Sequence, residues 1–168
     1  MMDNYIVING KKAELTEEQL KQLGINVQFE KNNPFGKITD HGYYYISTTG
    51  LINFAQNLHS SVDEDMYNNV NYFNNEHFTN QVMLHMKLYR KLLKYAYEND
   101  AIVTDWTDPD GKKYFISKSM KKNTFYVNWS YMVKSGCCEV YFTSKEVTKR
   151  AIMDVVIPFT KEHPEFVW

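Results

Sequence analysis

Apolar and polar residues alternate in several short segments, and this period of two predicts β-hairpins. The first hairpin runs from Tyr5–Ile8 through the dipeptide Asn9–Gly10 into Lys11–Leu15. Asn-Gly favours a type I′ turn, because both central residues of that turn need a positive φ. A second hairpin is predicted from the strand-like segments Gly42–Ile46 and Leu51–Phe54.

A period of 3.6 residues predicts two main helices farther along the chain. The first spans residues 75–98 and carries two apolar stripes, one of Phe78, Val82, Met86, Tyr89, Leu93 and Ala96, the other of Leu84, Leu88, Leu92 and Tyr95. A helix that is apolar on two sides is expected to be central and covered from both. The second helix spans residues 144–157 and begins at the capping box Thr143-Ser144-Lys145-Glu146. Pro158 is expected to kink this helix or to end its regular part.

Two polar segments interrupt this pattern. Thr16-Glu17-Glu18-Gln19 fits a capping box and predicts a short helix that Gly24 ends. Residues 57–71 are polar and acidic, and we expect them to form a loop.

The C-terminal half adds more strands. A short one is expected at Ile102–Trp106, and three others at 112–120, 124–132 and 138–142. The pattern therefore predicts an α+β fold, in which an antiparallel β-sheet of hairpins packs with two main α-helices. A length of 168 residues is typical of one domain, so we expect residues 1–168 to form a single domain with 1–40 as a variable N-terminal subregion.

The chain also contains a weak internal similarity. Tyr72-Phe73-Asn74-Asn75 precedes the first main helix as Tyr141-Phe142-Thr143-Ser144 precedes the second, and Thr79 and Thr148 follow at the same offset. Either an old duplication or two independent strand-to-helix joints with similar capping chemistry explains this pattern.

Composition and charge exclude several classes of protein. Hydrophobic residues make up 43% and charged residues 23% of the chain, which indicates a packed core rather than disorder. The net charge of −1 argues against a dedicated duplex-DNA binder, which carries a basic footprint. Two adjacent cysteines, Cys137 and Cys138, make no disulfide framework, and from the sequence we expect neither a membrane-spanning segment nor a signal peptide. We therefore expect a cytoplasmic protein.

No motif for catalysis, cofactor binding or metal binding stands out. His77 and His85 are too far apart on one helix to share a metal, and Asp105, Asp108 and Asp110 lack the spacing of a calcium loop. The sequence thus predicts neither an enzyme nor a cofactor.

The predicted functional feature is a surface on the strand 124–132. Phe125, Val127, Trp129 and Tyr131 alternate and are expected to face the core. The opposite face would then carry an aromatic patch rimmed by lysines, which consists of Phe115, Tyr126, Tyr141, Lys113 and Lys121. Such a patch suits base stacking or a protein partner, unless the hairpins or the first main helix cover it.

Several structural motifs resemble those of small accessory proteins from phages and prophages of Gram-positive bacteria. They are Tyr72-Phe73 before the long helix, Leu88-Tyr89-Arg90-Lys91-Leu92 within it, Trp106, Val140-Tyr141-Phe142-Thr143-Ser144, and Pro158-Phe159. The resemblance covers residues 40–168 and implies a protein that acts in the cytoplasm of the bacterial host. Our leading interpretation is a non-enzymatic protein that binds and modulates a host protein or nucleoprotein, with inhibition of host defence as one version. The second interpretation is a single-stranded nucleic-acid-binding module.

Overall fold

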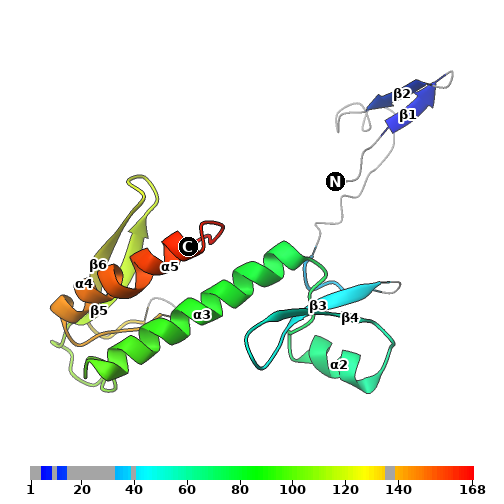
Figure 1. Ribbon diagram of the computed structural model, residues 1–168. Helices are drawn as coiled ribbons and strands as arrows, with labels where there is room; N and C mark the ends of the chain where they lie inside the picture. Colours follow the sequence, from blue (N-terminus) through cyan, green and yellow to red (C-terminus); the bar gives the residue numbers. More distant parts are fainter. Residues whose placement is uncertain (1–4, 9–10, 15–32, 39–40, 135–138) are drawn as a thin grey trace.

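The computed structural model describes residues 5–8, 11–14, 33–38, 41–134 and 139–168. Its strands pair antiparallel into three two-stranded hairpins, which together with the helices confirm the α+β prediction (Figure 1). The elements in chain order are β1 (Tyr5–Ile8), β2 (Lys11–Glu14), β3 (Gly42–Ile46), β4 (Ile52–Gln56), α2 (Ser61–Asn68), α3 (Glu76–Glu98), β5 (Lys113–Ser119), β6 (Thr124–Ser130), α4 (Lys145–Ala151), the π-helical turn η1 (Ile152–Val156) and α5 (Ile157–Glu162).

The predicted hairpins and the first main helix are confirmed, but other expectations need correction. The segment 57–71 is not a loop, because α2 occupies its centre. The segments 102–106 and 138–142 are not strands within the described residues, and only Ile102 and Phe142 make isolated bridges there. The expected helix at Thr16–Gly24 and the residues Cys137 and Cys138 lie outside the described residues.

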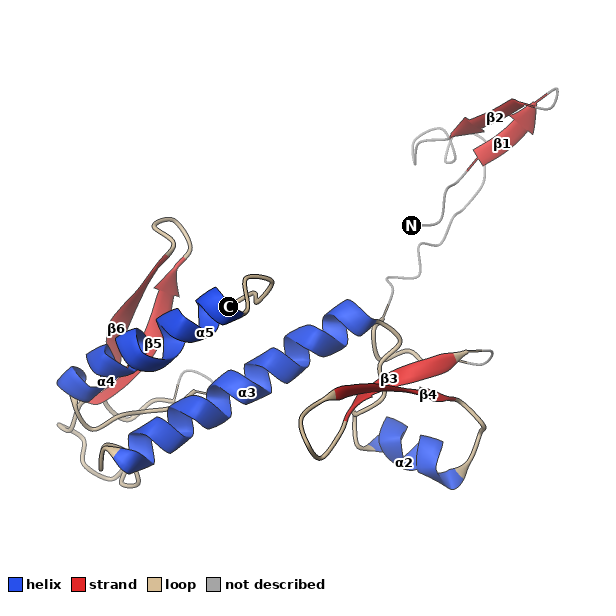
Figure 2. Ribbon diagram, viewed as in Figure 1, coloured by secondary structure: helices blue, strands red, loops and turns tan. Residues whose placement is uncertain are grey.

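Helix α3 is the central element of the molecule. It extends from the β3–β4 hairpin and α2 to the region of β5, β6 and α4 (Figures 1 and 2). The α4–α5 helix runs antiparallel to it, since Lys87 contacts His163 (3.2 Å) and Tyr95 donates to Asp154 (2.8 Å). The seam of α3 that faces this core consists of Leu84, Leu88, Leu92 and Ala96.

The second main helix continues past Pro158 to Glu162, but its regular α-helical part ends at Ala151 and a π-helical turn precedes the proline. The turn η1 widens the helix directly before α5, and the Ile157 N–H donates to the carbonyl of Ile152. Proline has no N–H to donate, so a carbonyl in the preceding turn of the helix loses its usual donor. In a π-helical turn each N–H donates to the carbonyl five residues earlier instead of four, and this changes which carbonyl is left without a donor. The helix therefore accommodates Pro158 without ending.

Phe73 and Phe142 occupy the same position in two similar arrangements. Phe73 exchanges both backbone hydrogen bonds with Tyr44 of β3, at 2.9 and 2.7 Å. Phe142 exchanges both with Tyr114 of β5, at 2.7 and 2.8 Å. In each case one short segment is added to the first strand of a hairpin, directly before a helix.

The similarity continues into those helices. Asn75 and Ser144 are their N-caps, and each side chain accepts from the backbone N–H three residues later. Thr79 and Thr148 are both fully buried, and each hydroxyl donates to the carbonyl of the corresponding cap, at 2.8 and 2.7 Å. These hydrogen bonds satisfy hydroxyls that would otherwise be costly to bury.

The repeat also includes residues that precede each hairpin. The Asn74 N–H donates to the carbonyl of Pro34 as the Thr143 N–H donates to that of Ala101. In the sequence, Tyr44-Tyr45-Ile46-Ser47 matches Tyr114-Phe115-Ile116-Ser117. The two parts of the chain share backbone hydrogen bonds, helix caps and a short sequence match. This extent of similarity favours duplication over coincidence. We call residues 33–98 the first unit and residues 101–162 the second unit.

The end of α2 contains a strained residue and yields a stability prediction. The Val70 N–H donates to Tyr67 O (3.1 Å) and the Asn71 N–H to Met66 O (2.9 Å), which is a Schellman motif. Val70 has a φ of 56°, a conformation that glycine adopts readily and a β-branched residue does not. We expect Val70→Gly to raise the free energy of unfolding by about 1 kcal/mol in urea denaturation.

Val133→Gly is the control for this prediction, because Val133 is equally exposed and lacks a positive φ. It should give no increase in the free energy of unfolding. A decrease for Val70→Gly would show that the backbone at this position is not strained.

Candidate binding groove

The predicted aromatic patch on β5 and β6 does not form as an exposed surface. Phe115 and Tyr141 are buried, with their ring centroids 5.3 Å apart. Trp106 covers Tyr141 at 4.9 Å, and the Lys113 ammonium, also buried, donates to the carbonyl of Asp108 at 2.7 Å. The prediction was wrong about exposure because the connection from α3 to β5 folds over this face.

On the other face of the β5–β6 hairpin, most residues that the alternation predicted to be in the core are found there. Tyr114 lies opposite Trp129 and Ile116 opposite Val127, and Ile116, Phe125 and Val127 pack in the core as expected. Trp129 is nevertheless 48% exposed. It contacts Tyr131, itself 40% exposed, near the open end of the hairpin, so the expectation that both are core residues needs correction.

Of the five patch residues, Tyr126 and Lys121 remain exposed. Tyr126 lies opposite Ser117 on the face that Phe115 shares, whereas Lys121 belongs to the turn between β5 and β6. Whether either residue binds a partner stays a prediction.

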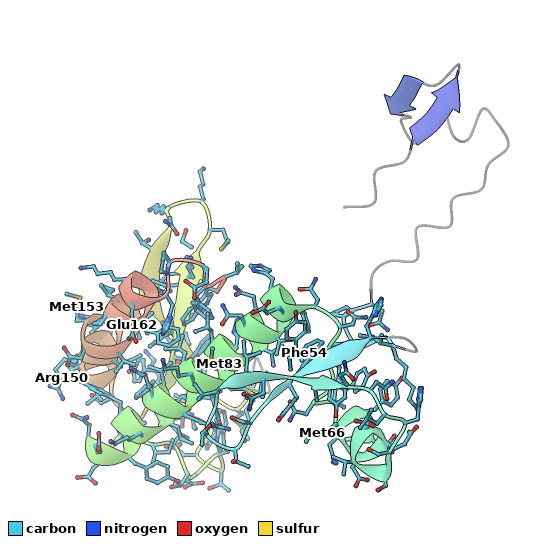
Figure 3. The ribbon with its side chains drawn as sticks, turned by 45° about the vertical axis from the view of Figure 1, so that its right-hand side comes forward. Phe54, Met66, Met83, Arg150, Met153 and Glu162 are labelled. Carbon is cyan, nitrogen blue, oxygen red and sulfur yellow. The ribbon has the colours of Figure 1, made fainter. Side chains whose placement is uncertain are left out.

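A more prominent feature is an open groove of about 430 Å³ between α3 and the turn of the β3–β4 hairpin. Apolar side chains form part of its wall, and two of them, Leu51 and Met86, are exposed at 64% and 39%. Met83 lies on α3 beside this hairpin, whereas Arg150 and Met153 project from the α4–η1 helix, away from it (Figure 3). The complete lining is Ile46, Thr49, Gly50, Leu51, Met83, Met86, Lys87, Arg90, Lys91 and Lys94.

Four cations border the groove along one side of α3. Lys87, Arg90, Lys91 and Lys94 recur at helical spacing, so the helix brings them to one face. Lys94 is 3.4 Å from Glu98 and Lys87 is 3.9 Å from Glu162, so both also have an anion nearby. The sequence does not predict this groove, because a hydropathy pattern does not reveal which face of a helix a hairpin leaves open.

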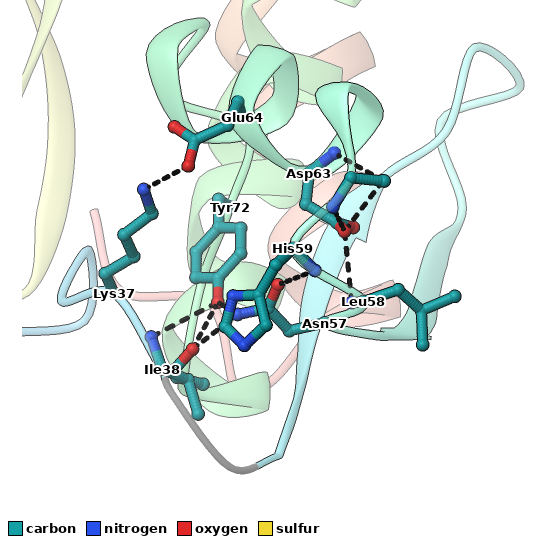
Figure 4. A network of polar contacts seen from close by, with 9 residues as sticks. Lys37, Ile38, Asn57, Leu58, His59, Asp63, Glu64 and Tyr72 are labelled. Carbon is teal, nitrogen blue, oxygen red and sulfur yellow. Dashed lines mark hydrogen bonds and ion pairs between the residues drawn. The ribbon is translucent and has the colours of Figure 1, made fainter.

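A polar network surrounds the start of α2 (Figure 4), and Tyr43 connects it to the hairpin that forms the other wall. Asp63 of α2 accepts a hydrogen bond from the Tyr43 hydroxyl of β3 at 2.9 Å, and its second carboxylate oxygen accepts from Leu58 and from Ser60. Ser60 and Asp63 cap each other reciprocally as a capping box. Tyr43 in turn stacks on Tyr72, with ring centroids 4.1 Å apart.

These contacts shift the pKa of both groups. Hydrogen bonds from Ser60 lower the pKa of Asp63 to about 2, with smaller contributions from Tyr43 and Leu58. Burial raises the pKa of Tyr43 to about 12, and its hydrogen bond to Asp63 acts in the same direction. Asp63 is thus a structural carboxylate that joins α2 to β3.

Two other kinds of functional feature were not found among the described residues. They contain no group of three or more His, Cys, Asp or Glu side chains placed to hold a metal ion. None of the described helices has the length and apolar character needed to cross a membrane.

Comparison of the chain with protein-family models, with curated proteins and with solved structures finds no match.

The burial of Phe115 and the exposure of Tyr126 give opposite expectations for two aromatic substitutions. Phe115→Ala should lower the free energy of unfolding by about 3–5 kcal/mol, since it removes a buried ring. Tyr126→Ala should lower it by less than about 1 kcal/mol. Chemical denaturation monitored by circular dichroism measures both, and similar losses for the two variants would contradict the arrangement of this hairpin.

Asp63 predicts a pH dependence of stability. Its pKa is lower in the folded chain than the ordinary value of 3.8, so its stabilising effect is complete above about pH 5 and is lost as the pH falls toward about 2. Asp63→Asn should therefore flatten the decrease in melting temperature over this interval. Asp65→Asn, on the exposed side of the same helix, should leave the decrease unchanged; a wild-type slope in Asp63→Asn would show that the carboxylate is not held this way.

Proposed function

We propose that this chain is a non-enzymatic binding protein that engages an acidic region of a macromolecular partner through the α3 groove. The observation that carries the proposal is the combination of exposed apolar side chains with four cations in one groove, on a chain whose net charge is −1. The positive charge is therefore local.

The two kinds of side chain would contribute differently to binding. Leu51 and Met86 supply apolar surface that is removed from water when a partner binds. The methionine side chain also adapts to irregular surfaces. Arg90, Lys91 and Lys94 would attract an acidic partner and raise its rate of association, an effect that salt reduces. A partner with both an apolar and an acidic face suits the groove better than a purely charged one.

The resemblance to phage accessory proteins supplies the proposed setting. The partner would be a host protein or nucleoprotein in the bacterial cytoplasm, and binding would modulate its activity. Inhibition of a host defence system is one form of such modulation.

Single-stranded nucleic acid is the second candidate partner, and a separate surface favours it. Trp129 of β6 and Tyr131 beside it are 48% and 40% exposed, with ring centroids 5.1 Å apart, and the Lys112 ammonium lies 4.9 Å from the centroid of the Trp129 ring. Exposed aromatic rings with nearby cations are typical of surfaces on which bases stack. The α3 groove, in contrast, has no aromatic side chain in its lining.

Charge reversal in the groove tests the proposal. Arg90→Glu with Lys94→Glu should reduce capture of the partner from infected cells by about tenfold or more, because two attractive charges become repulsive. Mass spectrometry and nucleic-acid detection on the same eluate measure the loss.

The matched control is Lys145→Glu with Lys149→Glu, which makes the same charge change at the same spacing on the exposed face of α4. It should retain the partner. Equal loss in both variants would mean that overall charge, not the groove, governs capture, and loss upon nuclease treatment would favour the nucleic-acid candidate.

A further inference from the structure

The second unit shows what occupies the position that is open in the first unit. Ile116 of β5 and Ile152 and Val156 of the α4–α5 helix are buried together in one cluster. Leu88 and Leu92 of α3 belong to the same cluster. The side chains of the second unit are therefore covered by a helix that precedes this unit in the chain.

The corresponding residues of the first unit line the groove. The offset of 70 residues that relates Tyr44 to Tyr114 relates Ile46 to Ile116. The offset of 69 that relates Thr79 to Thr148 relates Met83 to Ile152; the π-helical turn then adds one residue to the second helix, so that Met86 corresponds to Val156. All three of these first-unit residues line the groove.

The first unit also differs from the second in a way that indicates the chemistry of its occupant. Val156 is completely buried, whereas its counterpart Met86 is 39% exposed; Lys87 and Arg90 lie beside Met86 and also line the groove. The open face of the first unit therefore combines apolar side chains with cations beside them. An occupant that is apolar along its whole face would bury the Arg90 guanidinium against apolar side chains, which is costly unless a carboxylate lies beside it.

From these observations we infer that the groove binds an amphipathic acidic helix of a partner protein, in the position that α3 occupies on the second unit. This inference rests on the proposed function and specifies its partner. The helix carries apolar residues four apart, as Leu84, Leu88 and Leu92 are, with acidic residues beside them. Met83 to Lys94 spans about 16 Å along α3, which is about three turns of helix.

The geometry also fixes the direction of this helix. Two contacts show how α3 lies on the second helix. Gln81 near the start of α3 donates to the carbonyl of Glu165, whereas Tyr95 near the end of α3 donates to Asp154. The two helices are therefore antiparallel. The partner helix should run antiparallel to α3, with its N-terminal end beside Lys94.

A synthetic peptide provides the test. The probe is a fluorescein-labelled peptide of about 16 residues with leucines four apart and glutamates beside them, and the comparison is a scrambled peptide of identical composition whose leucines do not share a helical face. Anisotropy titrations with the full chain should show about tenfold or greater preference for the amphipathic peptide. Met86→Asp should abolish the preference, while Met153→Asp, an exposed methionine off the groove, should retain it.

The outcomes separate this inference from the proposed function. Equal binding of both peptides, reduced by Arg90→Glu with Lys94→Glu, would support an acidic partner and overturn the helix. Binding of neither peptide would overturn both. Leu20 and Leu23 are the leucines of the helix predicted at Thr16–Gly24. Binding that appears only after Leu20→Asp with Leu23→Asp would assign the groove to the chain's own N-terminal residues and overturn the external partner.

The orientation of the bound peptide relative to α3 is checked on the complex of the chain with the amphipathic peptide. A photo-crosslinker at the N-terminus of the peptide should attach to α3 near Lys94, and one at the C-terminus should attach nearer Met83, as mapped by mass spectrometry. The reverse pattern would overturn the equivalence of the two units on which the inference rests.

Discussion

Burial of one face of α3 is the interaction on which the rest of this structure depends. A two-stranded hairpin is marginal by itself in water, so β3–β4 and β5–β6 each need a helix to cover an apolar face. Helix α3 meets both needs, because its first turns pack near β3 and its leucine seam packs on the second unit. Substitutions in Leu84, Leu88 or Leu92 would therefore affect both units together.

The same arrangement explains why the groove exists. Repetition of one hairpin-and-helix unit gives each unit a face that a preceding helix can cover. The second unit is covered by α3, and the corresponding face of the first unit is the groove lined by Ile46 and Met83. Cations at Lys87 and Arg90 keep this face compatible with water, whereas Val156 and Phe159 in the second unit are fully packed. The binding surface is thus a variation of the packing that builds the fold.

Local signals in the sequence predicted much of this fold. Periodicity located α3 and the hairpins, and capping chemistry located the start of α4. Helix α2 was missed because it has little apolar character and depends on Asp63, whose contacts with Tyr43 and Ser60 are partly long-range. Continuation of the helix past Pro158 depends on a π-helical turn that no sequence rule located.

The candidate site was harder to predict than the fold. Alternation assigned the faces of β5 and β6 correctly, but exposure depends on what folds over each face. Tyr141 covers Phe115 and Trp106 covers Tyr141, and both come from segments that were predicted as strands but lie in irregular connections. The basic face of α3 was visible in the sequence as Arg90, Lys91 and Lys94, yet only tertiary packing shows that the hairpin leaves it open beside apolar side chains.

The most direct measurement for this account is hydrogen–deuterium exchange of the full chain with and without the amphipathic acidic peptide. The account predicts slower amide exchange in residues 44–51 and 82–94, where the groove lies, and unchanged exchange in residues 124–133. Slower exchange confined to residues 124–133 would contradict it and would place the binding surface on β6.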